Sequence, residues 1–248
     1  MRTYFLTDTG KVRDHNEDSV IILQNSNNEY LLAVADGMGG HKAGEVASQM
    51  AINHLTKKFN ELSSVGGKSD AVNWIRKEVA EINDSIFDYT SEHPESLGMG
   101  TTLVIAIFTK DYLLFGNVGD SSGFVFKNEK LYKVTRDHTL VNLLVKTGEL
   151  TPEEAENHPK KNILMRALGA NNPAEVDIFD VDTDVDGIVL CSDGLTTMLN
   201  ENQVERVLLT NNTLEEKVIK LIRKCNVRGG TDNISIAVLL TNEEEEGI

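Results

Sequence analysis

Short runs of β-branched, aromatic and other apolar residues, separated by polar turns, predict about ten strands. They lie near 2–7, 18–24, 30–35, 101–109, 112–118, 123–127, 130–135, 176–181, 186–191 and 233–240. Between 103 and 134 these runs follow one another with tight connections, which favours antiparallel pairing over a regularly alternating parallel fold. Because about ten antiparallel strands are more than a single open sheet usually contains, we expect two packed sheets.

Apolar residues at helical spacing predict helices at 43–62, 71–89, 201–209 and about 214–226. The apolar stripe of the first helix contains Val46, Met50, His54 and Leu55. The last helix follows Thr213 and Glu216, which have the spacing of a capping box. No internal repeat or change of composition divides the chain. We therefore expect one α+β domain, a four-layer α/β/β/α sandwich of two mostly antiparallel sheets flanked by helices.

Composition and charge narrow the functional classes. The 248 residues are 40% hydrophobic, which suffices for a buried core, and the formal net charge of −15 disfavours binding to nucleic acid. The longest apolar run, 103–108, is far shorter than the roughly 20 residues of a membrane span, and the first residues lack the apolar core of a signal peptide. We expect a cytoplasmic protein with no membrane contact. Cys191 and Cys225 lack the close spacing of zinc or redox motifs, so we interpret both as core residues.

Acidic residues recur where apolar strands stop. Asp36 and Asp193 each follow an apolar run and precede a glycine, Asp120 follows a third run, and Asp232 stands just before the last strand. A single Asp-Gly pair most simply marks a hairpin turn. After Asp36 and Asp193, however, the chain enters helix-like segments instead of a returning strand. These four carboxylates are therefore expected at loops beyond the sheets, where functional groups gather.

Carboxylates brought together from distant positions repel one another unless they are protonated or bound to cations. A cluster of cations is the simpler solution. Oxygen ligands favour magnesium or manganese over zinc, and calcium stays open, although no EF-hand loop is present. Arg13 precedes Glu17 and Asp18 by four and five positions, which could place a guanidinium beside the metals to bind phosphate; a surface salt-bridge run is the alternative.

Together these segments resemble the metal-dependent type 2C protein phosphatases, the PPM family, and in particular its compact bacterial members. The resemblance spans nearly the whole chain. Its landmarks are Thr7-Asp8-x-Gly10, Arg13-x-x-Asn16-Glu17-Asp18, Ala35-Asp36-Gly37-Met38-Gly39-Gly40-His41, Ala43-Gly44-Glu45, Met99-Gly100-Thr101-Thr102, Asn117-Val118-Gly119-Asp120-Ser121, Asp137-His138, Ser192-Asp193-Gly194-Leu195 and Gly229-Gly230-Thr231-Asp232-Asn233-Ile234-Ser235. The resemblance implies a phosphatase domain over 1–242 with a flap segment at about 139–168, followed by an acidic tail at 243–248.

The resemblance also implies a set of metal ligands. Asp36 would bridge two central Mn²⁺ or Mg²⁺ ions. Asp193 and Asp232 would complete the first ion, while Glu17 and the carbonyl of Gly37 would serve the second.

Three further residues take roles by the same resemblance. Asp120 would hold a third ion together with Asp193, and Asp18 would contact metal-bound water. Arg13 would grip the substrate phosphate, which makes Arg13, Asp36 and Asp193 the residues expected to matter most for catalysis. A water between two cations becomes acidic enough to attack phosphorus, so no phosphoenzyme is expected.

The chain departs from the family pattern at two positions. Many eukaryotic relatives have a histidine where this chain has Met38, so the general acid is open between His41 and a metal-bound water. Ser122 stands where the family commonly has an arginine, which removes an expected ion pair near Asp120.

The implied function is hydrolysis of phosphoserine and phosphothreonine on proteins by a monomeric enzyme, opposing a bacterial serine/threonine kinase. Two alternatives belong to other classes. A pseudophosphatase would only bind partners, but such proteins usually lose a metal ligand or the phosphate arginine, and this chain retains them. A related metal phosphohydrolase would act on small molecules or within a transcription-control switch, and the sequence discriminates poorly against it.

Overall fold

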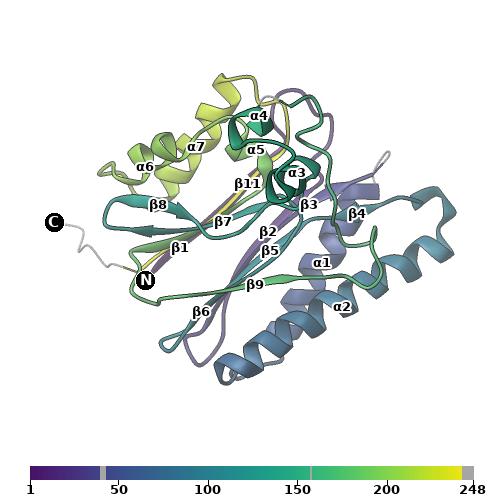
Figure 1. Ribbon diagram of the computed structural model, residues 1–248. Coiled ribbons are helices and arrows are strands. Elements are labelled where there is room, and N and C mark those ends of the chain that lie inside the picture. Colours follow the sequence, from purple (N-terminus) through teal and green to yellow (C-terminus); the bar gives the residue numbers. More distant parts are fainter. Residues whose placement is uncertain (40–42, 157, 242–248) are drawn as a thin grey trace.

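The computed structural model describes residues 1–39, 43–156 and 158–241. Two antiparallel sheets lie face to face, with α1 (Ala43–Asn60) and α2 (Lys68–Glu92) outside one sheet and α6 (Glu201–Leu208) and α7 (Leu214–Val227) outside the other (Figure 1). The predicted four-layer α+β sandwich is confirmed. None of the described helices is both long and apolar enough to span a lipid bilayer.

The first sheet has the order β1-β11-β10-β7-β8. Its strands are β1 (Arg2–Asp8), β11 (Ile234–Leu240), β10 (Gly187–Cys191), β7 (Ser122–Lys127) and β8 (Lys130–Lys133). Strand β11 lies between β1 and β10, so the two ends of the described chain meet inside one sheet.

The second sheet has the order β2-β3-β5-β6-β9, with β4 paired to the end of β3. Its strands are β2 (Asp18–Gln24), β3 (Tyr30–Met38), β4 (Gly100–Thr101), β5 (Leu103–Phe108), β6 (Leu113–Val118) and β9 (Asp177–Val181). The prediction that β3 ends before Asp36 is wrong. Gly37 and Met38 continue the strand because they pair with Thr101 and Gly100 of β4.

Three apolar layers hold the sandwich together. Alternation along β3 sends Leu32 and Val34 to the layer between the sheets and Leu31 and Ala33 to the layer beneath α1 and α2. A third layer lies between the first sheet and α6 and α7, and it contains both cysteines, which are free thiols. The interpretation of the cysteines as core residues is confirmed.

The buried stripe of α1 differs from the predicted one. Leu55, which was predicted, and Ala47 and Ala51, which were not, are fully buried against the sheet, whereas Val46 and Met50 lie on a half-buried flank. Small residues face the sheet because the helix packs closely on it, and a count of large apolar residues overlooks them. The capping box of α7 is confirmed, since Thr213 Oγ1 accepts from Glu216 N–H and a Glu216 carboxylate oxygen accepts from Thr213 N–H.

Shorter helices complete the chain. A 3-10 helix, η1 (Pro94–Ser96), follows α2, and α5 (Asp193–Thr196) follows β10. The flap segment contains α3 (Leu140–Thr147) and α4 (Pro152–Glu156). In α3 the side chain of Thr139 caps the first turn, and Gly148 ends the helix in the left-handed conformation with φ of 79°.

Candidate metal centre

Asp18 and Asp36 lie opposite each other at one end of the sandwich, as paired residues of β2 and β3. Asp18 is buried, with 7% of its surface exposed, and its Oδ2 accepts a 2.7 Å hydrogen bond from Ser192 Oγ. Its other oxygen, Oδ1, is buried and has no hydrogen-bond partner among the described residues. A buried carboxylate oxygen left without a partner is costly, so this position calls for a cation or a water.

The backbone of Asp36 is fixed by the Thr102 residue between β4 and β5. Asp36 N–H donates to Thr102 Oγ1 at 3.0 Å, and Thr102 N–H donates to the Asp36 carbonyl at 2.8 Å. Burial raises the pKa of Asp36 well above its ordinary value, and so do the charges of Asp18, Asp193, Asp120 and Asp232, in that order. Carboxylates from five separate places in the chain therefore share one environment.

Two of these acids come from loops that follow buried strands. Asp193 is the first residue of α5, and burial followed by the charge of Asp232 raises its pKa to about 6. Asp120 follows β6 after the Gly119 turn, and burial followed by the charge of Asp193 raises its pKa to about 7. In both cases the largest cause of the raised pKa is burial, which removes the charged carboxylate from water.

Arg13, Asp232 and Glu17 form the rim of the centre. Arg13 Nη2 lies 2.8 Å from Asp232 Oδ2, and about half of the arginine side chain is exposed. Burial raises the pKa of Glu17, whereas the nearby guanidinium lowers it. The Arg13 guanidinium thus lies beside the acids, and part of its N–H fork stays free to donate to a ligand.

Glu17 lies against the contact between Gly37 and Gly44. Gly37 N–H donates to the carbonyl of Glu17 at 3.1 Å. A Cβ on Gly44 would lie 2.8 Å from Glu17 Oε2, and one on Gly37 would collide with the Gly44 carbonyl. Only glycines at both positions allow β3, α1 and the Glu17 loop to meet this closely.

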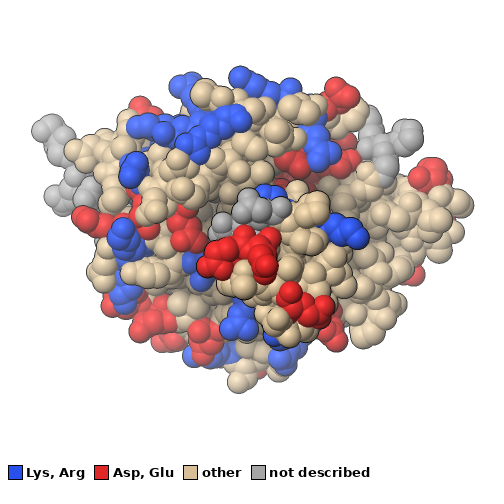
Figure 2. Space-filling view, turned by 45° about the horizontal axis from the view of Figure 1, so that its top comes forward, with Lys and Arg blue, Asp and Glu red and all other residues tan. Residues whose placement is uncertain are grey.

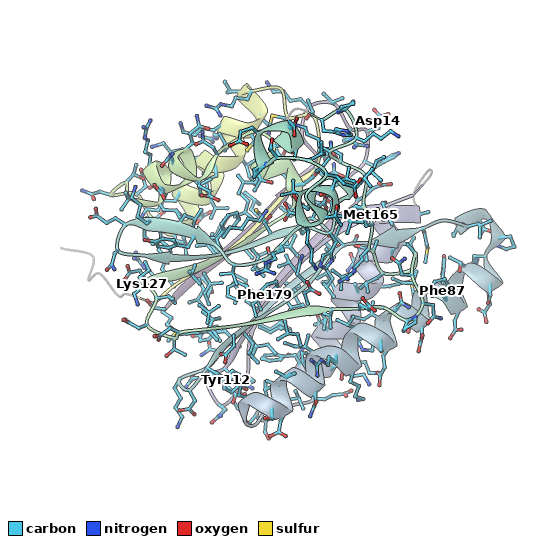
Figure 3. All side chains as sticks on the ribbon, in the orientation of Figure 1. Asp14, Phe87, Tyr112, Lys127, Met165 and Phe179 are labelled. Atoms are coloured by element: carbon cyan, nitrogen blue, oxygen red, sulfur yellow. The ribbon has the colours of Figure 1, made fainter. Side chains whose placement is uncertain are left out.

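A cavity of about 650 Å³ opens beside the acids. Asp120 and Asp193 line one side, and Val141, Val145 and Pro152 of the flap segment line the other. Figure 3 shows Asp14 and Met165, which lies in the flap segment, on the side of the molecule away from Tyr112. Figure 2 turns that end forward and shows acidic side chains near the middle of the face and basic ones along its upper edge.

Residues 10–229 match the family described as Protein phosphatase 2C. The chain belongs to this family. It is 43% identical to the serine/threonine phosphatase stp of Listeria welshimeri, over all of this chain and 98% of the relative. It is 35% identical to the protein phosphatase PhpP of Streptococcus pneumoniae, over 99% of each chain.

A solved structure shares the architecture. The serine/threonine phosphatase of S. agalactiae superposes with a TM-score of 0.92 at 36% identity, covering 97% of this chain and 99% of that one. Protein phosphatase 2C enzymes are metal-dependent hydrolases. In this member of the family the buried carboxylates, the Asp18 Oδ1 that has no partner in the described part of the chain, and the oxygen donor set fit hard divalent cations.

One positioning residue of this Protein phosphatase 2C domain was missed by sequence reasoning. The Asn233 side chain donates to the carbonyls of Thr9 and His15 at 2.9 Å each and accepts the Glu17 N–H at 2.8 Å. It thereby fixes the loop that carries Arg13 and Glu17. The sequence signal for it was its place in the motif Gly229 to Ser235, to which no supporting role was assigned.

The two departures from the family pattern have different outcomes. His41, the candidate general acid, lies outside the described residues. Met38 ends β3, where its side chain packs near Gly100. Ser122 is buried, and its hydroxyl lies 3.4 Å from the Asp120 carbonyl, so this position contributes a neutral contact instead of an ion pair.

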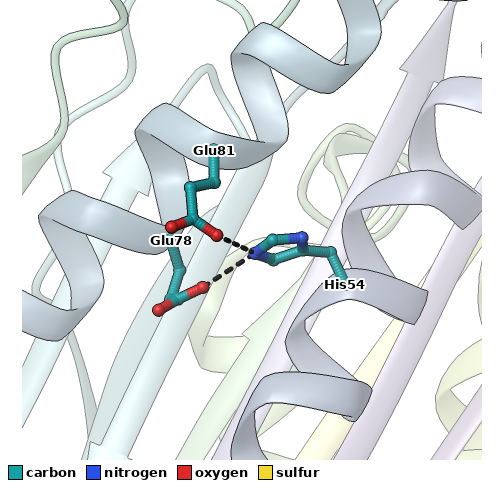
Figure 4. Close-up of side chains that lie close together, drawn as sticks. All are labelled: His54, Glu78 and Glu81. Carbon is teal, nitrogen blue, oxygen red and sulfur yellow. Dashed lines mark hydrogen bonds and ion pairs between the residues drawn. The ribbon is translucent and has the colours of Figure 1, made fainter.

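A second cluster of potential ligands lies between α1 and α2 (Figure 4). His54 Nε2 lies 2.7 Å from Glu78 Oε2 and 3.6 Å from Glu81 Oε2. Lys58 lies 3.0 Å from Glu81, and Lys77 contacts both glutamates at 3.3–3.4 Å. Because these lysines already compensate the carboxylates, we interpret the cluster as an ion-pair network that joins the two helices.

Proposed function

We propose that this chain hydrolyses phosphoserine and phosphothreonine on proteins, using divalent cations held at the acidic end of the sandwich. The observation that carries the proposal is the convergence of buried acids around Asp36, with Arg13 on their rim. The full-length similarity to bacterial serine/threonine phosphatases supports the same reaction.

The proposed ligands follow the places of the acids. Asp36 would bridge two central Mn²⁺ or Mg²⁺ ions, with Asp193 and Asp232 on the first and Glu17 and the Gly37 carbonyl on the second. The burial of Asp36 and Asp193, and the repulsion that Asp193 and Asp232 exert on Asp36, support this arrangement, because cations would relieve both.

A third ion is proposed between Asp120 and Asp193, whose charges interact and which line the same cavity. Asp18 would orient a water in the centre, since Ser192 holds one of its oxygens and leaves the other without a partner among the described residues.

When bound, such cations supply Lewis-acid stabilisation of phosphoryl oxygens and lower the pKa of water toward neutrality. The protein's own groups bind and orient the substrate. Arg13 is held by Asp232 at one nitrogen, so its planar fork is aimed while its remaining N–H groups can donate to phosphate. For the general acid we propose His41 or a water. Met38 is excluded because a thioether carries no proton to donate.

We further propose that the substrates are phosphorylated proteins, among them a cognate serine/threonine kinase, and that the enzyme is a cytoplasmic monomer. The domain would cover 1–242, with the flap segment at 139–168 beside the cavity and an acidic tail at 243–248. The names of the relatives support a protein substrate, and the cavity between flap and acids supplies room for a peptide next to the phosphate.

The decisive experiment measures phosphate release from a phosphothreonine peptide and from p-nitrophenyl phosphate, with and without Mn²⁺. We expect turnover of both that disappears in EDTA. Mn²⁺ binding without turnover would establish a pseudophosphatase instead. Turnover of small phosphate esters with none of phosphopeptides would establish the small-molecule phosphohydrolase.

A further inference from the structure

His138 stands where the flap segment leaves the body of the protein and returns to it. Its N–H donates to the Gly119 carbonyl at 2.9 Å, and its carbonyl accepts the Met165 N–H at 2.8 Å. One residue further, Thr139 and Leu164 form an isolated β-bridge. The backbone of His138 therefore joins both ends of the flap segment to the turn that precedes Asp120.

The imidazole ring repeats this connection with its side chain. Nδ1 accepts a 3.1 Å hydrogen bond from Gly119 N–H, so the ring proton resides on Nε2. Nε2 lies 3.3 Å from Asp177 Oδ2 of β9, although this contact lacks the alignment of a hydrogen bond. Burial lowers the pKa of His138, which agrees with a neutral ring that can accept at Nδ1.

The Gly119 turn has little freedom to adjust by itself. Its φ of 109° suits only glycine, and a Cβ there would lie 2.6 Å from the side chain of Thr102. Thr102 is the residue whose hydroxyl accepts the Asp36 N–H. The turn is thus enclosed by His138 on one side and by the support of Asp36 on the other.

Asp177 connects the ring to the far end of the flap segment. Its Oδ1 lies 3.0 Å from Arg166 Nη1, and Arg166 also contacts Glu175 at 3.2 Å. His138 and Arg166, from the two ends of the segment, therefore meet on one carboxylate.

We propose that His138 is a positioning residue that couples the flap segment to the Asp120 side of the metal centre, through its Nδ1 bond to Gly119 N–H. The inference rests on the proposed function, because it assumes that Asp120 binds a metal ion. His138 itself is neither one of the proposed ligands nor part of the rim formed by Arg13, Asp232 and Glu17. Without this acceptor the Gly119 N–H is buried and unsatisfied, and the turn must move to find water or another partner. Movement of the turn displaces Asp120, which follows it directly.

Three substitutions of His138 distinguish the contribution of Nδ1 from that of Nε2. Asparagine places its amide oxygen near the position of Nδ1 and can still accept from Gly119 N–H, whereas glutamine reaches toward Nε2 and alanine reaches neither. We expect His138→Ala and His138→Gln to raise the Mn²⁺ concentration for half-activation about tenfold, the scale typical of lost support around a metal site. His138→Asn should stay within about twofold of the unmodified protein.

Calorimetric titration with Mn²⁺ alone gives a second readout that does not need turnover. We expect the Mn²⁺ affinities of the variants to follow the same order as their half-activation concentrations. The weakest Mn²⁺ site should be lost first in His138→Ala. Asp177→Asn keeps the Nδ1 acceptor and serves as the matched control. It removes the charge that pairs with Arg166, which still contacts Glu175, and its Mn²⁺ titration should be unchanged.

Equal Mn²⁺ titrations for the unmodified protein and the three His138 variants, in the presence of normal turnover, would overturn the inference and leave the proposed function intact. A His138→Asn variant as impaired as His138→Ala, or an Asp177→Asn variant with the same loss of Mn²⁺ affinity, would also overturn it. A merely structural histidine would lower the Tm of His138→Ala and His138→Asn alike without separating their Mn²⁺ midpoints. Failure of the unmodified protein to turn over any phosphoester would refute the proposed function, and the calorimetric order would still test the role of His138.

Discussion

Replacement of Asp120 by asparagine should stabilise the metal-free protein, and the gain should grow with pH. Burial and the neighbouring Asp193 charge raise the pKa of Asp120 from 3.8 to about 7. In the absence of cations the folded protein must therefore hold a proton that the unfolded chain releases at lower pH. Asparagine has the same shape and never ionises, so it removes this cost.

The sign and size follow from linkage. Because the folded pKa lies above the unfolded one, the stability from protonated Asp120 is complete below about pH 4 and is lost as the pH rises to about 7. The difference of about three units between the folded and unfolded pKa of Asp120 corresponds to about 4 kcal/mol of unfolding free energy, of which about 2 kcal/mol is already lost at pH 5. For a chain of this length, about 4 kcal/mol raises the Tm by about 10 °C.

The assay is thermal unfolding in EDTA at several pH values from 5 to 8. Asp184→Asn is the control, because Asp184 is 87% exposed and pairs only with Lys127 among the described contacts. We expect Asp120→Asn to unfold at higher temperature than the unmodified protein, with a gap that widens up to about pH 7, and Asp184→Asn to change little. With excess Mn²⁺ the order should reverse. An Asp120→Asn variant that is no more stable than the unmodified protein in EDTA at pH 8 would refute the reasoning.

Three further substitutions test separate parts of the structure. Asp193→Ala should abolish Mn²⁺-dependent hydrolysis of p-nitrophenyl phosphate without lowering the Tm in EDTA, since it removes a charge that repels Asp120 and Asp36; retained activity would contradict its proposed ligand role. Arg13→Ala should raise KM for a phosphothreonine peptide more than it lowers kcat, with partial recovery in Arg13→Lys; a pure loss of kcat would show that the guanidinium does not bind substrate. Glu29→Gln should cost about 2 kcal/mol in unfolding measurements at neutral pH. Both oxygens of the buried carboxylate accept hydrogen bonds, from Asn25, Asn27, Ser64 and Val65, and the NH2 group of glutamine cannot accept. Burial raises the pKa of Glu29, but its hydrogen bonds outweigh this and lower it, so its stabilisation is present above about pH 4.5 and is lost as the pH falls through the lowered pKa; a Tm gap that does not shrink on acidification would contradict this.

The strands could be predicted from sequence because most are apolar runs that end at polar turns. Strand β10 shows this well, since 186–191 was expected and Gly187–Cys191 is found. The end of β3 could not be predicted, because Gly37 and Met38 extend the strand only through pairing with residues more than 60 positions away. The stripe of α1 was misjudged for a similar reason: alanines face the sheet where the helix packs closely, and sequence periodicity weights large residues more.

The acids of the candidate centre could be located from sequence because each stands beside a strand in a recognisable motif. The residues that hold these acids in place could not be located from sequence. Asn233 binds the Thr9 carbonyl, and Ser192 binds Asp18, across more than 170 positions in each case. Such contacts leave no local pattern, and they become visible only when the fold brings the segments together. The metal roles of the acids themselves stay predictions until ions are titrated.

The position of β11 has a consequence for the time at which the protein becomes active during its synthesis. The first strand, β1, pairs along its whole length with β11, from Arg2 opposite Leu240 to Asp8 opposite Ile234. A nascent chain on the ribosome therefore holds β1 without its partner until translation has passed Leu240. Asp232 and Asn233 emerge at the same late stage, so the loop with Arg13 cannot be anchored earlier. Truncated translation products that end before β11 should consequently lack phosphatase activity.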